Sequence, residues 1–197
     1  SEMCIRDRVR PENIADFSGR IYKEANRLGN LVADIIQLSR LDEQQDAVVS
    51  MESVELDELA KDVVNNLRDH AEKKNISLDY CGIPINIQGV RHVLYEMLYN
   101  IADNAVRYTN PGGHIHIYVG RKGDRPFYRV EDDGIGIPKS EQKRIFERFY
   151  RVDKSHSRQT GGTGLGLSIV KHGATLHHAQ INVDSDLGKG TKMELLF

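Results

Sequence analysis

Segments with the period of a helix alternate with segments that have the period of a strand, from residue 55 to the end of the 197-residue chain. Leu56, Leu59, Val63 and Leu67 follow one helical face, and later runs alternate apolar and polar residues as strands do. Such an alternation predicts helices layered on a sheet. We therefore expect an α+β fold, a two-layer α/β sandwich whose mixed sheet carries its helices on one face. The predicted helices are 55–74, 90–107, 139–147 and 165–178, and the predicted strands are 76–80, 85–88, 114–120, 126–131, 180–184 and 191–197.

A long helix with a narrow apolar stripe is predicted at residues 11–41. A narrow stripe on a charged helix is typical of a coiled coil or helical bundle, and an amphipathic helix packed on its own domain is the alternative. Residues 42–50 lose the period and form a predicted linker, so the expected units are 11–50 and 51–197. Residues 1–10 are left unassigned, because Ser1–Arg8 resemble translated sequencing-adapter sequence. The stripe consists of Ile14, Phe17, Ile21, Leu28, Leu31, Ile35 and Leu38.

The composition argues against several classes of protein. A formal net charge of −2 offers no broad basic field for nucleic acid or anionic lipid. The two cysteines, Cys4 and Cys81, are too few for a disulfide framework and too isolated for a zinc cluster. No run approaches the roughly 18 apolar residues that cross a bilayer. We expect the chain as given to be soluble, in a reducing cytosolic setting.

The helix predicted at 90–107 carries polar side chains on one face. Asn100 and Asn104 are four residues apart, so they stack on that face, where amide oxygens can coordinate a hard cation such as Mg²⁺. Arg107 lies one further turn along. Taken alone, this spacing is more often that of a solvated helix face, and that alternative stays open.

Two glycine-rich strings follow. In the first, Asp132–Gly136, a carboxylate after a strand can accept a hydrogen bond from an exocyclic amine, and the glycines leave room for a flat ligand. Such a string alone is often only a turn. The second, Gly161–Ser168, opens a helix and can present backbone N–H groups to phosphate, or it is a flexible capping loop. It matches neither the Walker nor the Rossmann pattern.

Together and in order, these residues resemble the catalytic and ATP-binding domain of sensor histidine kinases. The wider superfamily also holds gyrase, a heat-shock chaperone and mismatch-repair ATPases. The resemblance covers about residues 51–197, and the helix before it is similar to the second helix of the kinases' dimerisation hairpin. The matching segments are Asn100–Thr109 (N box), Asp132–Gly136 (G1 box), Phe146–Arg151 (F box), Gly162–Leu167 (G2 box) and Gly188–Thr191 (last glycine box).

The resemblance implies a site for MgATP. Asp132 would accept the adenine N6 amine, which favours ATP because GTP presents a carbonyl oxygen there. Tyr108 would pack on adenine, and Arg107 would contact phosphate. Asn104 would hold Mg²⁺ with Asn100 alongside, and a lid at about 151–161 would close over the nucleotide. The other nucleotide-binding residues implied are Gly134, Gly136, Ile137, Arg151, Gly162, Thr163, Gly164, Leu165, Gly166, Leu167 and Thr191.

Asn100 also bears on the reaction. The resemblance implies that ATPases of the superfamily carry a water-activating glutamate at this position, whereas histidine kinases carry asparagine. An amide cannot act as a base, so we expect slow hydrolysis and transfer to a neutral imidazole, which is already a nucleophile. Catalysis would rest on positioning and charge neutralisation, with Asn100 and Arg107 in the site. Glu96, one turn earlier, would assist as a base or belong to the polar face.

The acceptor histidine of the family has no counterpart here. None of the eight histidines has the His-Glu/Asp-x-x-Thr/Asn-Pro neighbours of that acceptor. We therefore expect the C-terminal piece of a longer kinase, which binds MgATP yet does not phosphorylate itself. The resemblance implies three partners: the acceptor hairpin, a response-regulator receiver domain, and a second subunit of the full-length protein. That protein would be anchored in the plasma membrane by upstream segments, with this domain in the cytoplasm.

Two other functions on the same fold stay open. An anti-sigma-type serine kinase would normally lack the leading helix at 11–41, and the acid stability of the phosphoamino acid discriminates it. An ATP-gated interaction module would bind ATP and transfer nothing. The intact glycine boxes and Asn104 argue against that module.

Overall fold

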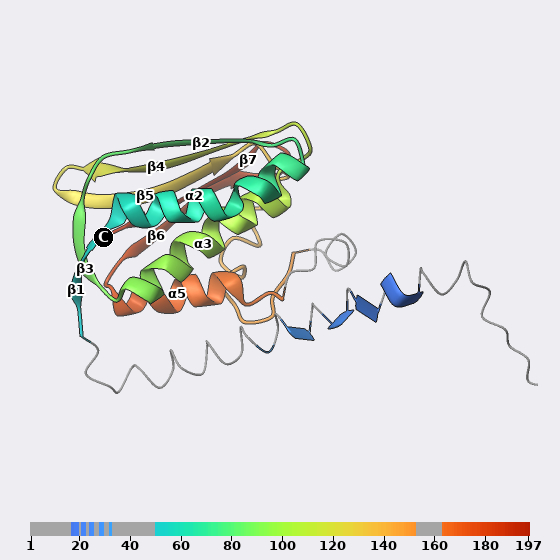
Figure 1. The fold of residues 1–197 in the computed structure, drawn as a ribbon, viewed down its shortest axis with the longest axis horizontal. Helices are drawn as coiled ribbons and strands as arrows, with labels where there is room; N and C mark the ends of the chain where they lie inside the picture. Colours follow the sequence, from blue (N-terminus) through green and yellow to red (C-terminus); the bar gives the residue numbers. More distant parts are fainter. Residues whose placement is uncertain are drawn as a thin grey trace, which may run out of the picture.

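A computed structural model describes residues 17–19, 21–22, 24–25, 28–29, 32, 50–152 and 163–197. Its main body is a five-stranded sheet with three helices packed on one face (Figure 1). The helices are α2 (Leu56–Lys73), α3 (Arg91–Tyr108) and α5 (Gly166–Leu176), and the strands are β2 (Ser77–Gly82), β4 (His114–Lys122), β5 (Arg125–Asp132), β6 (Gln180–Asp186) and β7 (Gly190–Leu196).

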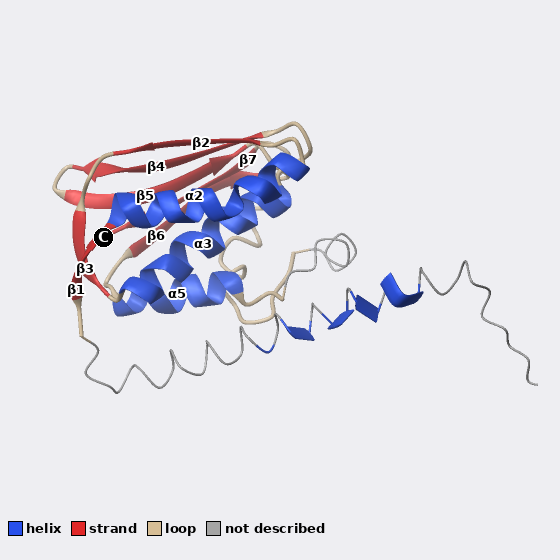
Figure 2. Ribbon diagram, in the orientation of Figure 1, coloured by secondary structure: helices blue, strands red, loops and turns tan. Residues whose placement is uncertain are grey.

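The sheet is mixed, as the sequence predicts. Its strand order is β2-β4-β5-β7-β6, in which β2 runs parallel to β4 and every other pair is antiparallel. Figure 2 shows the helices on one side of this sheet, with α3 between α2 and α5. The predicted two-layer α/β sandwich is therefore confirmed.

A small second sheet was only half predicted. Strand β3 (Asn86–Gly89) was expected, but β1 (Glu52–Glu55), with which it pairs antiparallel, was not. β1 has four residues, of which only Val54 is fully buried, so it shows no alternation long enough to detect. Next to this sheet, the Leu56 N–H donates to the carbonyl of Ile85 at 2.8 Å and fixes the start of α2.

The helix predicted at 139–147 is wrong. The structure has successive turns there, with the N–H of Arg144 bound to the carbonyl of Glu141 and that of Glu147 to the carbonyl of Arg144, both at 2.8 Å. Ile145 is the one fully buried residue of this segment. A segment this short lacks an apolar face with which packing could stabilise a continuous helix.

The long helix predicted at 11–41 falls largely outside the described residues. Those described between 17 and 32 are helical and exposed, and they include Phe17, Ile21 and Leu28 of the predicted stripe. The rest of the stripe and the predicted linker up to residue 49 lie outside the described residues. Within the described part of the chain, no helix has the length and apolar character needed to span a bilayer.

Helix α3 lies at the centre of the core. Its buried residues include Leu94, Met97 and Leu98, which are not exposed at all, and they pack within one cluster with residues of α2, α5 and the sheet. The hydroxyl of the fully buried Tyr128, on β5, donates to the carbonyl of Leu98 at 3.2 Å. This bond satisfies the one polar atom of the largest buried side chain.

A buried carboxylate joins α2 to the edge strand β2. Asp57 is 1% exposed and accepts hydrogen bonds from the Tyr80 hydroxyl and the Lys61 ammonium. Although burial opposes ionisation, these two donors lower the pKa of Asp57 below its ordinary value. Burial and the nearby carboxylate raise the pKa of Tyr80, so its proton stays in the bond. The interaction therefore holds α2 against the sheet.

Replacing Tyr80 by Phe should lower the free energy of unfolding by about 1–3 kcal/mol, because the buried Asp57 loses a donor. Urea unfolding at pH 7 measures the change. Tyr95→Phe is the matched control, since its hydroxyl only accepts an exposed bond from Asn66. The control should change stability by less than about 0.5 kcal/mol. Equal effects of the two variants would refute the special role of the Tyr80 hydroxyl.

Candidate nucleotide-binding site

The polar face of α3 points to the start of α5. Glu96, Asn100 and Asn104 lie four residues apart and are half-buried. The Asn100 amide nitrogen donates to the Glu96 carbonyl at 2.8 Å, which leaves the amide oxygen as an acceptor. A Cβ atom at Gly166 would lie 2.6 Å from that oxygen, so only glycine lets α5 begin this close to Asn100.

The start of α5 is held by its own loop. Leu165 is fully buried, and its N–H donates to the Thr163 hydroxyl at 3.3 Å. The Gly164 carbonyl accepts the Phe149 N–H at 2.9 Å, which ties the F-box segment to this loop. The first turn of α5 contains no acidic residue, so no carboxylate of that turn opposes an anion at the positive helix end. Leu167 is half-buried in the same turn, and Gly162 lies outside the described residues.

Asp132 ends strand β5 with its carboxylate mostly buried. The Gly134 N–H donates to one carboxylate oxygen at 2.9 Å, and the backbone of Thr191 also binds this carboxylate. Burial outweighs these bonds and, with the neighbouring Asp133, raises the pKa of Asp132 to about 6. Among the described residues no cationic side chain forms a salt bridge to Asp132. The carboxylate is thus suited to a donor from outside the chain.

Residues at the end of α3 lie beside residues 133–137, the loop after β5 that is called the G1 loop below. The Tyr108 carbonyl accepts the Ile135 N–H at 3.2 Å, which joins the two segments. The Tyr108 side chain is 36% exposed. The Arg107 guanidinium contacts the Asp103 carboxylate one turn back along α3. The helix end therefore presents an exposed aromatic ring and a paired arginine next to the G1 loop.

The β6–β7 turn holds the other side of the G1 loop. The Ile137 N–H donates to the Ser185 hydroxyl at 2.8 Å, and this hydroxyl donates to the Gly190 carbonyl at 2.8 Å. The Thr191 hydroxyl lies 3.0 Å from that of Ser185. Ser185 is 4% exposed, and sequence reasoning missed it because a lone serine in a strand carries no spacing signal. Buried Gly136 lies within the loop that these bonds fix.

The predicted residues thus fall into one region. The α3 face and the start of α5 form one end, and the G1 loop with Asp132, Tyr108 and Thr191 forms the other. Arg151 is half-buried at the edge of the described segment. Most of the predicted lid, residues 153–161, lies outside the described residues.

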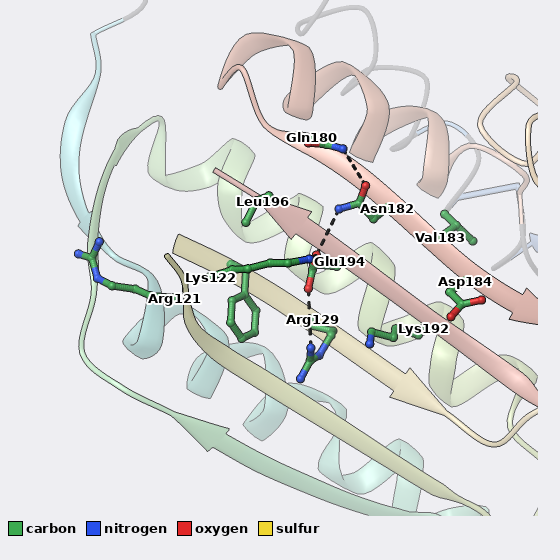
Figure 3. Close-up of a pocket in the computed structure, with 11 residues that line it drawn as sticks. Arg121, Lys122, Arg129, Gln180, Asn182, Val183, Asp184, Lys192, Glu194 and Leu196 are labelled. Atoms are coloured by element: carbon green, nitrogen blue, oxygen red, sulfur yellow. Dashed lines mark hydrogen bonds and ion pairs between the residues drawn. The ribbon is translucent and has the colours of Figure 1, made fainter. Parts of the chain in front are cut away.

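A groove elsewhere on the molecule does not belong to this site. It has a volume of 640 Å³ and lies on the strands of the sheet (Figure 3). Its lining side chains, such as Arg129 and Glu194, alternate along their strands with the buried residues Tyr128 and Leu195, so they face away from the helices. Arg129 pairs with Glu194 at 3.7 Å and with Glu131 at 3.1 Å. The charges of this groove are thus paired with one another, and Glu194 is itself only 5% exposed.

Comparisons with known proteins decide the family. The sequence model described as "Histidine kinase-, DNA gyrase B-, and HSP90-like ATPase" matches residues 89–197, which hold all the boxes named above. The chain belongs to this family. Its homologues over most of its length are sensor histidine kinases, so the domain is the catalytic ATPase domain of that type.

Individual relatives agree with this assignment. The chain is 34% identical over 186 residues to "Sensor-like histidine kinase SenX3" of Mycolicibacterium smegmatis, covering 94% of this chain and 48% of that protein. The chain spans about half the length of the first curated relatives it matches.

Solved structures show the same fold. "Mycobacterial sensor histidine kinase MprB" is 26% identical with a TM-score of 0.65, covering 75% of this chain and 96% of that one. Full-length ShkA, solved in complex with AMPPNP, is 26% identical with a TM-score of 0.75, covering 92% of this chain and 38% of that one. The two-layer sandwich is thus shared with structures of histidine kinases.

Two neighbouring carboxylates of this kinase-type domain should affect its stability in opposite directions. The pKa of Asp132 is higher in the folded chain than in the unfolded one, so its ionisation lowers stability as the pH rises through about 6. Asp132→Asn should therefore raise the free energy of unfolding at pH 7 by on the order of 1–2 kcal/mol. Backbone and side-chain bonds from His114 lower the pKa of Asp133, so Asp133→Asn should reduce stability at pH 7.

Urea unfolding of both variants at pH 7 and at pH 3 tests this expectation. The Asp132→Asn difference should disappear at pH 3, which lies below the pKa of this carboxyl in both the folded and the unfolded chain. The Asp133→Asn difference should shrink less, because the pKa of Asp133 in the folded chain lies below its ordinary value of 3.8. Destabilisation by both variants at pH 7 would contradict the assignment of Asp132 as a destabilising charge.

Proposed function

We propose that this domain binds MgATP and transfers its γ-phosphoryl group to a histidine, for relay to an aspartate of a response regulator. The proposal rests on the half-buried Asp132 carboxylate at one end of a site, which has no salt bridge to a cationic side chain among the described residues. The other end holds Asn100 and Asn104 on one face of α3, and the N-terminus of α5. An adenine amine and a triphosphate are the groups that these two ends suit.

The adenine end would be formed by the G1 loop and the end of α3. The Asp132 carboxylate would accept the N6 amine in addition to its bond from the Gly134 N–H. The exposed Tyr108 ring would pack on the base. Gly134, Gly136, Ile137 and Thr191 would line the pocket, because hydrogen bonds hold their loop beside Asp132. This arrangement selects adenine over guanine, which has an oxygen in place of the amine.

The phosphate end would be formed by α5 and the polar face of α3. Backbone N–H groups between Thr163 and Leu167 would bind phosphate oxygens at the positive end of α5. Arg107 would exchange part of its contact with Asp103 for phosphate. The remaining nucleotide-binding residues proposed are Arg151, Gly162, Gly164, Leu165 and Gly166.

Asn100 and Asn104 fit a magnesium ion. The Asn100 amide nitrogen is engaged with Glu96, so its oxygen remains as a hard ligand, and Asn104 lies one turn along the same face. Mg²⁺, when bound, supplies neutralisation of the phosphate charge. Asn104 would hold the ion, with Asn100 alongside.

The reaction would be an in-line phosphoryl transfer. An imidazole nitrogen of the acceptor forms the new N–P bond, the bond from the γ-phosphorus to the bridging oxygen breaks, and ADP leaves. The imidazole proton passes to water or to Glu96. Asn100 cannot activate water as a base, so hydrolysis would remain slow beside transfer. Positioning and charge neutralisation would supply most of the rate.

The whole protein would use this domain in a two-component system. Its relatives are sensor kinases about twice as long as this chain, so an acceptor hairpin would act as the first partner and a receiver domain as the second. The helix with exposed residues at 17–32 would belong to that hairpin and pair in a homodimer. Segments outside this chain would anchor the protein in a membrane, with the catalytic domain in the cytoplasm.

Asp132→Asn should weaken ATP binding about ten- to a hundred-fold, because a charge-assisted hydrogen bond to the adenine amine is lost. Titration calorimetry at pH 7.5 with MgATP measures the dissociation constant. Asp133→Asn is the matched control and should bind within about two-fold of the parent, since Asp133 is exposed and bound to His114. A folded Asp132→Asn variant with the parent affinity would defeat the adenine assignment.

Phosphoryl transfer is tested by mixing the chain with γ-labelled MgATP and a separately made acceptor hairpin from a related kinase. We expect acid-labile, base-stable label on the hairpin and none on this chain, because its own histidines lack the acceptor neighbours. Acid-stable label on a serine would favour the serine-kinase alternative. ATP binding without transfer to any of several hairpins would favour an ATP-gated interaction module.

A further inference from the structure

Lys74 reaches from the end of α2 to the end of α3. It follows the last residue of α2, and its side chain is half-buried. Its ammonium donates to three backbone carbonyls, those of Val106 at 2.7 Å, Arg107 at 2.9 Å and Thr109 at 3.0 Å. All three hydrogens of the ammonium therefore have acceptors on one helix terminus.

These bonds complete the hydrogen bonding of that terminus. The last four carbonyls of a helix have no partner within the helix. In α3 the Ala105 carbonyl accepts the Thr109 N–H at 2.9 Å, and the Tyr108 carbonyl accepts the Ile135 N–H at 3.2 Å. Lys74 takes the two carbonyls between them. A cation at the negative end of a helix is also favoured by the helix dipole.

Lys74 holds its charge without a carboxylate. Within the described parts of the chain no Asp or Glu forms a salt bridge to it, and burial together with the Arg107 guanidinium lowers the pKa of the Lys74 ammonium. Its hydrogen-bond partners in the described residues are the carbonyls of Val106, Arg107 and Thr109 at the end of α3. Partial burial of a cation costs free energy unless hydrogen bonds offset it, so these bonds hold the ammonium and the end of α3 together.

The bonds of Lys74 fix the end of α3 at its junction with the G1 loop. A Cβ atom at Gly134 would lie 2.5 Å from the Tyr108 carbonyl oxygen, so the loop approaches the helix end too closely for any side chain. The Gly134 N–H binds Asp132, and the Ile135 N–H binds Tyr108. A shift of the last turn of α3 would thus move the G1 loop with it.

We propose that Lys74 is a positioning residue of the nucleotide site: by binding the last turn of α3, it sets where Tyr108, Arg107 and the G1 loop meet ATP. This inference rests on the proposed ATP site. Lys74 acts through the backbone of α3 and does not itself contact the nucleotide. Its effect should therefore appear in affinity and in local hydrogen bonding.

Lys74→Met is the decisive variant, with Lys73→Met as matched control because Lys73 is the exposed neighbour in α2. Titration calorimetry with MgATP should show affinity weakened about ten-fold or more for Lys74→Met and unchanged within about two-fold for Lys73→Met. Lys74→Arg should recover most of the loss, since its guanidinium keeps the charge and several donors.

Amide hydrogen exchange separates this role from a general loss of stability. In Lys74→Met the Ile135 and Thr109 amides should exchange at least about ten-fold faster relative to the Val130 amide in the central strand β5. A uniform increase at all three amides would overturn the inference. If Lys74→Met does not fold, Lys74→Gln, which keeps donors without the charge, replaces it in both measurements.

The calorimetry distinguishes failure of the proposed function from failure of this inference. A parent chain that binds no ATP overturns the proposed function and this inference with it. A parent chain that binds ATP, beside a folded Lys74→Met variant of the same affinity, overturns the inference alone.

Discussion

The structure depends on helix α3 being held at both ends. At its start, the Val90 N–H donates to Nε2 of His177 at 2.9 Å, while Nδ1 of that ring donates to the Gly173 carbonyl at 2.7 Å. Burial lowers the pKa of His177, which keeps the imidazole neutral and able to accept the first bond. At its other end, Lys74 and the G1 loop occupy the free carbonyls. Helix α3 is thus joined to α5 at one end and to α2 at the other.

This constraint explains how remote motifs form one site. The N-box residues face α5 only because α3 and α5 pack closely, and Gly166 permits the approach. Asp132 lies in the same region because it is the last residue of β5, which is the central strand of the sheet on which α3 packs. The helices and sheet therefore act as a rigid support, and loops carry the groups that would meet the ligand.

Sequence reasoning identified the parts with a strong local period and missed those without one. α2, α3 and α5 have clear apolar faces, and the five strands of the main sheet alternate, so their existence was predictable. β1 is too short to show a period, and the 139–147 segment has a local helical pattern without an apolar face to bury. Long-range hydrogen bonds were not predictable, because no local pattern encodes them. The Lys74–Val106 bond joins residues 32 positions apart, and the Val90–His177 bond joins residues 87 positions apart. The bond of Ser185 to Ile137 spans 48 positions.

The uncovered face of the sheet has a consequence for assembly. Aligned residues of three strands, Asn182, Glu194 and Arg129, form a row across it, and the Asn182 amide donates to Glu194 at 3.2 Å (Figure 3). Lys122 and Lys192 on the same face keep exposed ammonium groups, which pair with Glu194 and Glu131. Stacking two copies by these faces would remove water from these ammonium groups at a desolvation cost. The exposed charges of this face thus disfavour stacking of two sheets against each other.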